Sequence, residues 1–574
     1  MPKVTIDGQT IEFDGQNRLL KFALDQQIEI PYFCYHPAMS IPTNCRMCLV
    51  EIGNHQKNRE TGEFMYDDQG NPVVQWFPKP MTSCNQPLAD GLFVKTHRTS
   101  EKIRIAQKGV LEYMLINHPL DCPICDQAGE CPLQIWTYKY GPEGSRFEAT
   151  KGHKNKRVEL GPRVMLDEER CINCTRCTRF TEEISKSNQL SIVGRGEKNC
   201  PGTAPGQSFD EPYSMNVIDI CPVGALTSRA HRFKARVWEM NHSPAIDIND
   251  STGTNIHVWV RDNKVLRITP RENQVINKYW LPDAHRLNVD IYNENRVSGI
   301  SLKGGIPVGD FETGIKQAAA LLKGRSGQTL LLGSAYASLE SNYALRELAA
   351  QLGVSDIYYI PHIEAGHGDN WLIQDDRTPN AASCELLGFH PLELSDLKSK
   401  LKSREVSFLY SLENDRAFAE LGEEELSAVT SLVHGYQYQS GHSFVDVLLP
   451  AAMSLEAEGV YINFKQIAQV STLARQFRQM TPEQWMRLPK SRLDKGAVAV
   501  DRWRNLDHIF DVLPAWLLIS KVARAAGLDM RYETHADIFG QIKPEFEVLK
   551  DVTVSYKAPK SAFKTTQLEF APKW

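Results

Sequence analysis

The sequence predicts a multidomain protein of mixed α+β and α/β class, and three observations support this prediction. The chain has 574 residues, whereas a single hydrophobic core rarely grows beyond about 250–300 residues. Its 42% hydrophobic and 24% charged content are those of an ordinary globular protein. Twelve of the 13 cysteines lie before residue 222, and apolar strand and helix patterns fill the rest. We therefore expect small metal-binding modules first and a larger α/β domain after them.

Composition excludes several functional classes. The net charge of −5 comes from mixed signs, so the chain lacks the basic character typical of nucleic-acid binding. No apolar run approaches the ~18 residues that a membrane span needs. Residues 1–6 lead directly into a strand pattern, without a signal or transit segment. We expect the protein to stay in a reducing compartment, where clustered cysteines are metal ligands and not disulfides.

The first 30 residues predict two short strands and a helix. Val4–Ile6 and Thr10–Phe13 alternate in polarity, and Asp7-Gly8 between them is a hairpin signal. One face of a short helix is formed by Leu19, Leu20, Phe22 and Ala23. Two strands, a helix and a following cysteine loop resemble the plant-type [2Fe–2S] ferredoxin fold.

The first cysteine set has the spacing C-x10-C-x2-C-x35-C and consists of Cys34, Cys45, Cys48 and Cys84. The plant-type spacing, C-x4-C-x2-C…C, is tighter at its start, but both share a close pair and one distant cysteine. This set predicts a [2Fe–2S] cluster. A structural zinc site with four thiolates is the alternative, disfavoured because closed zinc sites usually pair two CxxC knuckles.

The second set has the spacing H-x3-C-x2-C-x5-C and consists of His118, Cys122, Cys125 and Cys131. A helix that Ser100 caps is predicted before it, with one face formed by Ile103, Ala106, Val110, Met114 and Leu115. Pro119 should end this helix and leave His118 at the edge of the cysteine loop. Three thiolates leave a fourth iron of a [4Fe–4S] cluster open, and His118 is the nearest candidate ligand. Its neutral imidazole should raise the reduction potential, and a zinc site is again the alternative.

The third set has the pattern C-x2-C-x2-C with a remote Cys-Pro, and consists of Cys171, Cys174, Cys177 and Cys221. This is the bacterial ferredoxin arrangement for a [4Fe–4S] cluster, and a zinc site rarely has it. Two cysteines are then left over. Cys200 lies in a Gly/Pro-rich stretch that is typical of a loop, and we interpret it as a free thiol. Cys384 has no candidate partner nearby and is predicted to be buried.

The three sets together resemble one family, the large iron–sulfur subunits (G subunits) of NADH–quinone oxidoreductase, or respiratory complex I. The resemblance is close over about residues 1–240. It is carried by the segments Tyr32–Pro37, Cys45–Glu51, His118–Asp126, Gly129–Gln134, Cys171–Cys177 and Asp219–Leu226.

The resemblance implies five domains. They are an N-terminal β-grasp [2Fe–2S] ferredoxin-like domain (1–97), a [4Fe–4S] domain with one histidine and three cysteine ligands (98–150), an all-cysteine [4Fe–4S] ferredoxin-like domain (151–236), a small β-rich domain (237–296) and a degenerate molybdopterin-oxidoreductase-like α/β domain (297–574). Several relatives carry another cysteine set at the start of the last part. Residues 235–283 contain no cysteine here, so we expect that extra cluster to be absent.

The apolar pattern of the last domain predicts its α/β class independently of the resemblance. Thr329–Leu332, an amphipathic Leu339–Leu352 and Ile357–Ile360 predict a βαβ unit of a doubly wound sheet. Val447–Pro450 and Gly459–Asn463 are similar to segments of the pterin enzymes. The Gly-Arg pair expected after them is replaced by Gln466-Ile467, and no Cys or Ser is placed to bind molybdenum. We expect a structural platform for partners, with residual pterin binding left open.

The resemblance implies an electron-transfer subunit without a complete active site. It would pass single electrons from a flavin/NADH-binding subunit, through one [2Fe–2S] and two [4Fe–4S] clusters, to a ferredoxin-like subunit leading towards quinone. No G-x-G-x-x-G loop for a nucleotide is present. Localisation would be peripheral, on the cytoplasmic side of a bacterial inner membrane or on the matrix side in mitochondria.

Two alternative functions share some of these motifs. An iron-only hydrogenase should have two CxxCxxCxxxCP motifs and later cysteines, and a diaphorase subunit of a bidirectional hydrogenase should end soon after Leu226. A molybdenum formate dehydrogenase needs a metal-ligating cysteine or selenocysteine in the C-terminal half. Cys384 is the one candidate, and its sequence context does not match.

Overall fold

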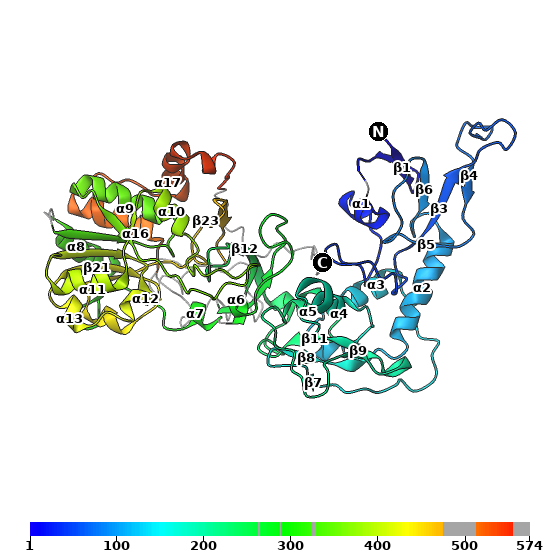
Figure 1. The fold of residues 1–574 in the computed structure, drawn as a ribbon, viewed down its shortest axis with the longest axis horizontal. Coiled ribbons are helices and arrows are strands. Elements are labelled where there is room, and N and C mark those ends of the chain that lie inside the picture. Colours follow the sequence, from blue (N-terminus) through cyan, green and yellow to red (C-terminus); the bar gives the residue numbers. More distant parts are fainter. Residues whose placement is uncertain (16, 262–263, 288, 324–327, 475–511, 555–574) are drawn as a thin grey trace, which may run out of the picture. The chain divides into compact units, whose positions relative to one another are not determined.

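The computed structural model describes residues 1–15, 17–261, 264–287, 289–323, 328–474 and 512–554 (Figure 1). These residues form two compact units, which meet in the sequence between Trp238 and Glu239. Segments 475–511 and 555–574 of the predicted last domain lie outside the described residues. None of the described helices is both long and apolar enough to cross a membrane.

The first unit begins with a mixed sheet in the strand order β2-β1-β6-β3-β4, with β5 paired to β3. Its strands are β1 (Lys3–Ile6), β2 (Gln9–Glu12), β3 (Leu49–His55), β4 (Val74–Trp76), β5 (Met81–Thr82) and β6 (Leu92–Lys95). The predicted hairpin is confirmed, because β1 and β2 pair antiparallel and the turn places Asp7 and Gly8 at positive φ of 52° and 87°. Helix α1 (Leu19–Asp25) buries the four predicted apolar residues against this sheet.

Two helices follow, α2 (Glu101–Leu115) and α3 (Pro132–Tyr140). The predicted cap of α2 is confirmed, since the Ser100 hydroxyl accepts a hydrogen bond from the Ile103 amide at 3.2 Å. The helix ends at Leu115, earlier than the predicted stop at Pro119. Lys151 Nζ donates to the carbonyl oxygens of Leu115 and Ile116, at 2.7 and 2.9 Å, and so satisfies two carbonyls that the helix leaves unpaired.

The third part of this unit is built from short elements. They are β7 (Val158–Glu159), β8 (Val164–Leu166), α4 (Arg176–Arg179), β9 (Ser191–Val193), β10 (Cys200–Gly202), α5 (Asn216–Ile220) and β11 (Leu226–Ser228). The prediction of a loop around Cys200 is wrong, because Cys200 begins β10 and pairs with Val193 of β9. A two-stranded ribbon this short accepts Pro and Gly, which is why the composition suggested a loop.

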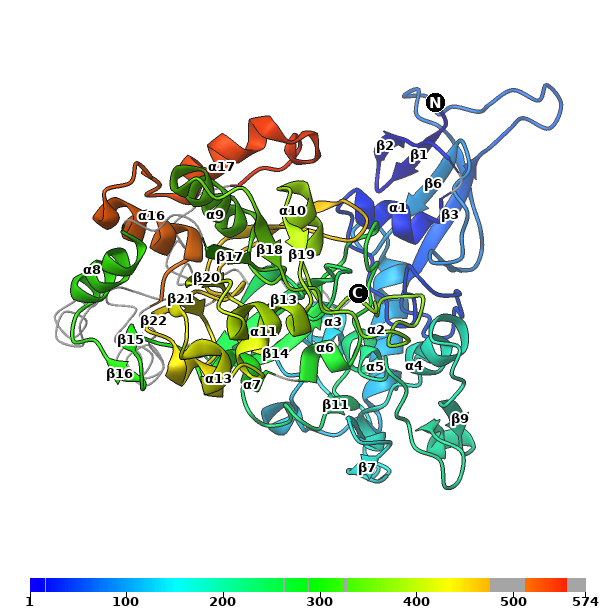
Figure 2. The same cartoon turned by 60° about the vertical axis from the view of Figure 1, so that its left-hand side comes forward.

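The second unit begins with an antiparallel sheet of β12 (Asn241–Ile246), β13 (Asn255–Arg261) and β14 (Lys264–Pro270). An eight-stranded sheet follows, in the order β16-β15-β22-β21-β20-β17-β18-β19 (Figure 2). Its members are β15 (Ser301–Leu302), β16 (Ile306–Pro307), β17 (Thr329–Gly333), β18 (Ile357–Tyr359), β19 (His390–Pro391), β20 (Phe408–Leu412), β21 (Thr430–Gly435) and β22 (Val447–Pro450). The six strands from β22 to β19 pair parallel.

Helices cover both faces of this sheet, as in a doubly wound fold. Leu331 of β17 packs in one hydrophobic cluster with α8 (Phe311–Leu322), α9 (Leu339–Leu352) and α16 (Ala515–Ala526). Its neighbours Leu330 and Leu332 pack on the opposite face with α11 (Leu394–Lys402). The predicted βαβ unit is therefore confirmed, as is the burial of Cys384, which is 0% exposed in α10 (Ala381–Leu386).

The remaining elements of the second unit are short or lie at its edges. They are α6 (Ala284–Leu287), α7 (Asp290–Asn293), α12 (Asp415–Phe418), α13 (Glu423–Leu426), β23 (Gly459–Ile462), β24 (Ala468–Ser471) and α17 (His535–Ile542).

Candidate functional site

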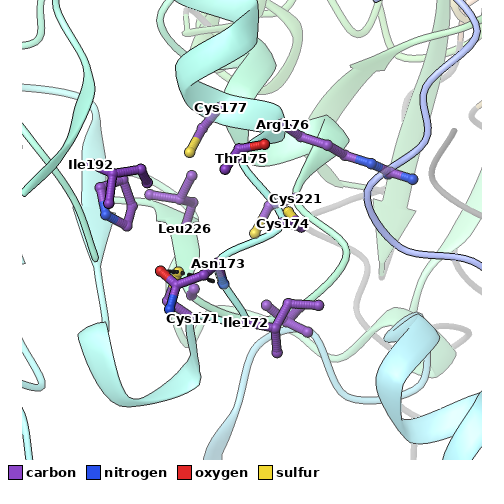
Figure 3. Close-up of a pocket in the computed structure, with 13 residues that line it drawn as sticks. Cys171, Ile172, Asn173, Cys174, Thr175, Arg176, Cys177, Ile192, Cys221 and Leu226 are labelled. Atoms are coloured by element: carbon purple, nitrogen blue, oxygen red, sulfur yellow. Dashed lines mark hydrogen bonds between the residues drawn. The ribbon is translucent and has the colours of Figure 1, made fainter. Parts of the chain in front are cut away.

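The third cysteine set lines a cavity in the first unit (Figure 3). Cys171 follows a single turn of 3-10 helix, Cys177 lies in α4, and Cys221 directly follows α5. Asn173 and Thr175 have positive φ of 52° and 61°, so the chain turns sharply on both sides of Cys174. The structure therefore brings all four predicted residues to one cavity.

The electrostatics of this cavity fit a cationic cofactor. Burial and the neighbouring thiols raise the pKa of Cys171 to about 12, and the same causes raise that of Cys174 to about 11. Burial also raises the pKa of Cys177. Four thiolates together are thus unfavourable here unless positive charge lies among them, which the irons of a cluster would supply.

The first set lies beside the sheet of the first module. Cys34, Cys48 and Cys84 are at most 1% exposed. Cys48 directly precedes β3, and Ser83, the neighbour of Cys84, donates its amide to the Cys48 carbonyl at 2.9 Å. Hydrogen bonding between sulfurs raises the pKa of Cys34 and lowers that of its partner Cys45 to about 6. A hydrogen bond with Cys84, together with burial, raises the pKa of Cys48. These contacts bring the four predicted residues together.

The second set lies between α2 and α3. Cys125 and Cys131 are 8% and 9% exposed, whereas Cys122 is exposed. Cys131 is the N-cap residue of α3. Burial, with the charge of Arg170 adding to it, lowers the pKa of the His118 imidazole to about 4, so the ring is neutral at pH 7. A neutral imidazole is the form that ligates a metal.

The second and third sets share one segment of chain, residues 221–224. Cys221 belongs to the third set, while a Cβ placed on Gly224 would lie 2.1 Å from Cys125 Sγ of the second set. Cys131 Sγ lies 3.8 Å from the Pro222 carbonyl oxygen. Only a few atoms of this segment therefore separate the two sets.

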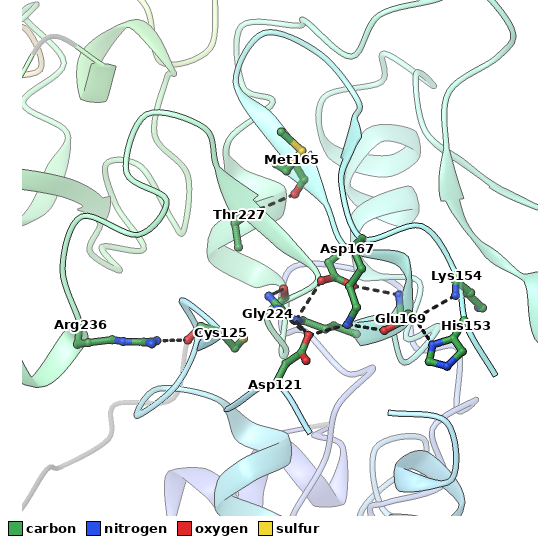
Figure 4. A network of polar contacts seen from close by, with 12 residues as sticks. Asp121, Cys125, His153, Lys154, Met165, Asp167, Glu169, Gly224, Thr227 and Arg236 are labelled. Atoms are coloured by element: carbon green, nitrogen blue, oxygen red, sulfur yellow. Dashed lines mark hydrogen bonds and ion pairs between the residues drawn. The ribbon is translucent and has the colours of Figure 1, made fainter. Parts of the chain in front are cut away.

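A polar network surrounds this shared segment (Figure 4). Arg170, which is 3% exposed and precedes Cys171, donates to Asp121 Oδ2 at 2.8 Å and to the Gly224 carbonyl at 3.5 Å. Asp121 precedes Cys122, so the guanidinium joins the beginnings of the two cysteine loops. Arg236 donates to the carbonyl oxygen of Cys125 on the other side.

Hydrogen bonds also join the chain segments that carry the first and third sets. Asn44, the neighbour of Cys45, donates from Nδ2 to the Asn173 carbonyl oxygen at 3.2 Å. The Ser40 amide, in the loop between Cys34 and Cys45, donates to Glu183 Oε2 at 2.7 Å. The third set thus contacts both of the others, an order that sequence spacing alone does not reveal.

The second unit contains a buried cluster that the sequence analysis missed, formed by Asp247, Asp250 and His285. His285 Nδ1 lies 2.6 Å from Asp247 Oδ2, and its Nε2 lies 3.6 Å from Asp250 Oδ2. Because different ring nitrogens face the two carboxylates, the arrangement suits a protonated imidazole between them better than a shared metal ion. Asp247 raises the pKa of His285 against the opposing effect of burial. Asp247 and Asp250 are close in the sequence, but His285 lies 35 positions further on, so the three residues form no recognisable motif.

A pocket lies where β17, β18 and β20 end. Its lining includes Tyr336, His362, Asn414 and Arg416, and the Tyr336 hydroxyl lies 2.7 Å from His362 Nδ1. The order of strands in the sheet reverses between β17 and β20, where open α/β sheets commonly bind ligands. No cysteine lines this pocket. The segments predicted to be similar to pterin enzymes, Val447–Pro450 and Gly459–Asn463, correspond to β22 and β23.

Comparison with protein families gives matches to three parts of the first unit and to the start of the second. The 2Fe–2S iron–sulfur cluster binding domain matches residues 4–84, and the NADH-ubiquinone oxidoreductase-G iron–sulfur binding region matches 107–146. The ferredoxin-like domain of NADH-quinone oxidoreductase subunit 3 matches 161–227. The NDSU1/NuoG-like 4Fe-4S domain matches 240–290, although that segment contains no cysteine. The chain therefore has 2Fe–2S and 4Fe–4S cluster-binding domains.

Comparison of the whole chain with curated proteins finds several relatives. The NADH-quinone oxidoreductase G subunit of Rickettsia bellii is 33% identical over 417 residues, or 70% of this chain and 57% of the relative. The NADH-ubiquinone oxidoreductase 75 kDa subunit of Reclinomonas americana is 37% identical over 366 residues, or 62% of this chain and 49% of the relative. The chain spans about half the length of the curated relatives it matches. Among solved structures, a chain of an NAD+-reducing [NiFe]-hydrogenase is 26% identical, with a TM-score of 0.32 over 41% of this chain and 91% of that chain.

Proposed function

We propose that the chain is a member of the family of large iron–sulfur (G) subunits of NADH–quinone oxidoreductases, to which its relatives and one of its family matches belong, and that it is an electron-transfer subunit of the peripheral arm of such an enzyme. It passes single electrons from a flavin subunit towards quinone, and it has no complete active site of its own. The observation that carries this proposal is the contact of the third cysteine set with both of the others within one compact unit.

We assign one [2Fe–2S] and two [4Fe–4S] clusters to the three sets. The [2Fe–2S] ligands are Cys34, Cys45, Cys48 and Cys84. The ligands of the two [4Fe–4S] clusters are His118, Cys122, Cys125 and Cys131 for one, and Cys171, Cys174, Cys177 and Cys221 for the other. The burial of most of these thiols and the raised thiol pKa values of the third set support this assignment.

The chain's own residues then have two tasks. An iron–sulfur cluster accepts and releases one electron at a time. The protein buries most of the ligand thiols, which limits the access of water to them, and the contacts between the loops give the order first, third, second. The neutral imidazole of His118 replaces a thiolate and makes its cluster less negative, which favours reduction of that cluster.

The partners of the relatives' family and this order of the sets together support two specific partner subunits. A flavin/NADH-binding subunit supplies electrons at the first set, and a ferredoxin-like subunit receives them from the second set, whose Cys122 is exposed. The assembled enzyme holds the chain at the cytoplasmic side of a bacterial inner membrane, or at the matrix side in mitochondria. The second unit lacks an extra cluster, since residues 240–290 contain no cysteine, and serves as a structural platform.

The test compares reduction by NADH in two preparations. In membranes containing the assembled enzyme, NADH should reduce the clusters, detected by low-temperature EPR. The isolated chain should require dithionite, because it has no site for hydride transfer. Reduction by hydrogen or formate, and not by NADH, would contradict the proposal and indicate a hydrogenase or formate dehydrogenase partner.

A further inference from the structure

We propose that two buried arginines, Arg176 and Arg179, are positioning residues that hold the loop of the first cysteine set against that of the third and so set the spacing of their two clusters. This inference rests on the proposed function, because it requires both sets to hold clusters. Both arginines lie on α4, the helix that carries Cys177. They are 0% and 6% exposed, which is unusual for a charged side chain.

Arg176 connects residues that adjoin a ligand of each set. It donates from Nη1 to the carbonyl oxygen of Ile220 at 3.0 Å, and from Nη2 to that of Tyr35 at 2.5 Å. Ile220 precedes Cys221, and Tyr35 follows Cys34. A single rigid guanidinium therefore spans from the backbone beside a third-set ligand to the backbone beside a first-set ligand. The fixed planar fork of donors suits this role, which a flexible ammonium group would perform less well.

Arg179 holds the same loop at a second point. It donates from Nη2 to the carbonyl oxygen of Cys34 itself at 2.5 Å, and from Nη1 to the carbonyl of Ser40 at 2.6 Å. The Ser40 amide in turn donates to Glu183, four residues after Arg179. The two arginines therefore make three hydrogen bonds to the segment Cys34–Ser40, all to backbone carbonyls, so this loop is held independently of its side chains.

The charge of the two guanidinium groups has a second consequence. Burying a cation is costly unless negative charge lies close by, and thiolate-ligated clusters provide such charge. Arginine stays protonated at any relevant pH. A buried cation between the two sites stabilises the more negative, reduced form of each cluster and so raises its potential. Substitutions that remove the guanidinium charge, and substitutions that keep the charge but change the geometry, should therefore distinguish the positioning role of these arginines from the effect of their charge.

The experiment uses the full chain, purified anaerobically and reduced with dithionite. In Arg176→Gln/Arg179→Gln we expect wild-type iron content, but a broadened dipolar coupling between the two-iron and four-iron EPR signals. At fixed ambient potential, the ratio of reduced to oxidised two-iron cluster should fall about tenfold, equivalent to about 59 mV. The matched control is Arg286→Gln, which removes a 5% exposed arginine from the second unit and should change neither quantity.

A second variant keeps the test decisive if the double variant does not fold. Arg179→Lys retains the charge but cannot hold both carbonyls with a planar fork, so we expect a broadened coupling with an unchanged potential. Coupling as in the wild type in these variants would overturn the inference and leave the proposed function intact. Absence of both EPR signals from the wild-type protein would instead overturn the proposed function.

Discussion

Gly224 and Cys125, which are 99 positions apart in the sequence, lie so close that a Cβ on Gly224 would stand 2.1 Å from Cys125 Sγ. The contact places a residue of the segment that closes the third ligand set directly against a ligand of the second. No side chain fits at position 224 while this sulfur keeps its place. Glycine is therefore required here for space, and its φ is not positive.

Gly224→Ala should displace Cys125 and disrupt the second site. We expect the loss of about four of the bound irons, or a changed signal of the four-iron cluster assigned to the second set, with the two-iron signal retained. The matched control is Gly109→Ala in α2, where the added methyl meets no atom within 4 Å. That substitution should stabilise the protein by about 0.5–1 kcal/mol. Unchanged iron content and spectra in Gly224→Ala would contradict the close approach.

His118→Cys should retain a [4Fe–4S] cluster but lower its potential by on the order of 100 mV, because a thiolate adds negative charge that the neutral imidazole lacks. Redox titration followed by EPR measures this shift. His55→Cys, at the end of β3 in the first module, introduces a thiol elsewhere and should leave the potential unchanged. An identical potential in His118→Cys would remove His118 from the ligand set.

Cys200→Ala should keep the full iron content, whereas Cys174→Ala should lose the third cluster. Cys200 is 6% exposed and lies on β10, where burial and the carboxylate of Glu168 raise the pKa of its thiol. Cys200 does not line the cavity of the third set, which Cys171, Cys174, Cys177 and Cys221 line. Iron analysis of the two variants side by side decides the matter, and a loss of about four irons from Cys200→Ala would show that it is a ligand.

His285→Gln should destabilise the second unit in a pH-dependent way. Burial, and to a lesser degree Arg377, lower the pKa of His285, but the carboxylates of Asp247 and Asp250 outweigh them and raise the folded-state pKa above its ordinary value near 6.5. The protonated ring therefore contributes stability fully below pH 6.5, and this contribution is lost as pH rises through the folded-state pKa.

The thermal unfolding midpoint of the full chain measures this effect. At pH 6, His285→Gln should lower the free energy of unfolding by about 3 kcal/mol, since removing one partner leaves buried carboxylates uncompensated. The difference from wild type should shrink towards pH 9. His367→Gln, at a histidine side chain that is 42% exposed in the same unit, is the control. A difference that grows with pH would contradict the assigned ion pair.

Local patterns predicted the elements well where one signal dominated. Leu339–Leu352 was predicted from its apolar periodicity, and α9 has these same bounds, with Ser338 capping it and Gly353 ending it in the left-handed region. The end of α2 was harder to predict, because Lys151 supplies partners for its last carbonyls from 36 residues away. Cys200 was wrongly predicted to lie in a loop, because Pro and Gly beside it are typical of loops. Its pairing with β9 is not visible in the sequence.

Spacing predicts the membership of each cysteine set, but it does not predict the relation between the sets. Cys171, Cys174 and Cys177 lie on one tight loop, so their spacing alone places them around one cavity. The contacts that join the sets connect residues about 90 to 145 positions apart, as with Pro222 and Cys131 or Arg179 and Cys34. Such contacts depend on tertiary packing and leave no local pattern.

Metal analysis combined with low-temperature EPR, on anaerobically purified and dithionite-reduced protein, tests the central claim most directly. The three assigned sites predict about ten irons per chain, with signals of both two-iron and four-iron clusters. Stoichiometric zinc without any EPR signal would contradict the account, since the cysteine sets would then be structural and the proposed electron transfer would have no carrier.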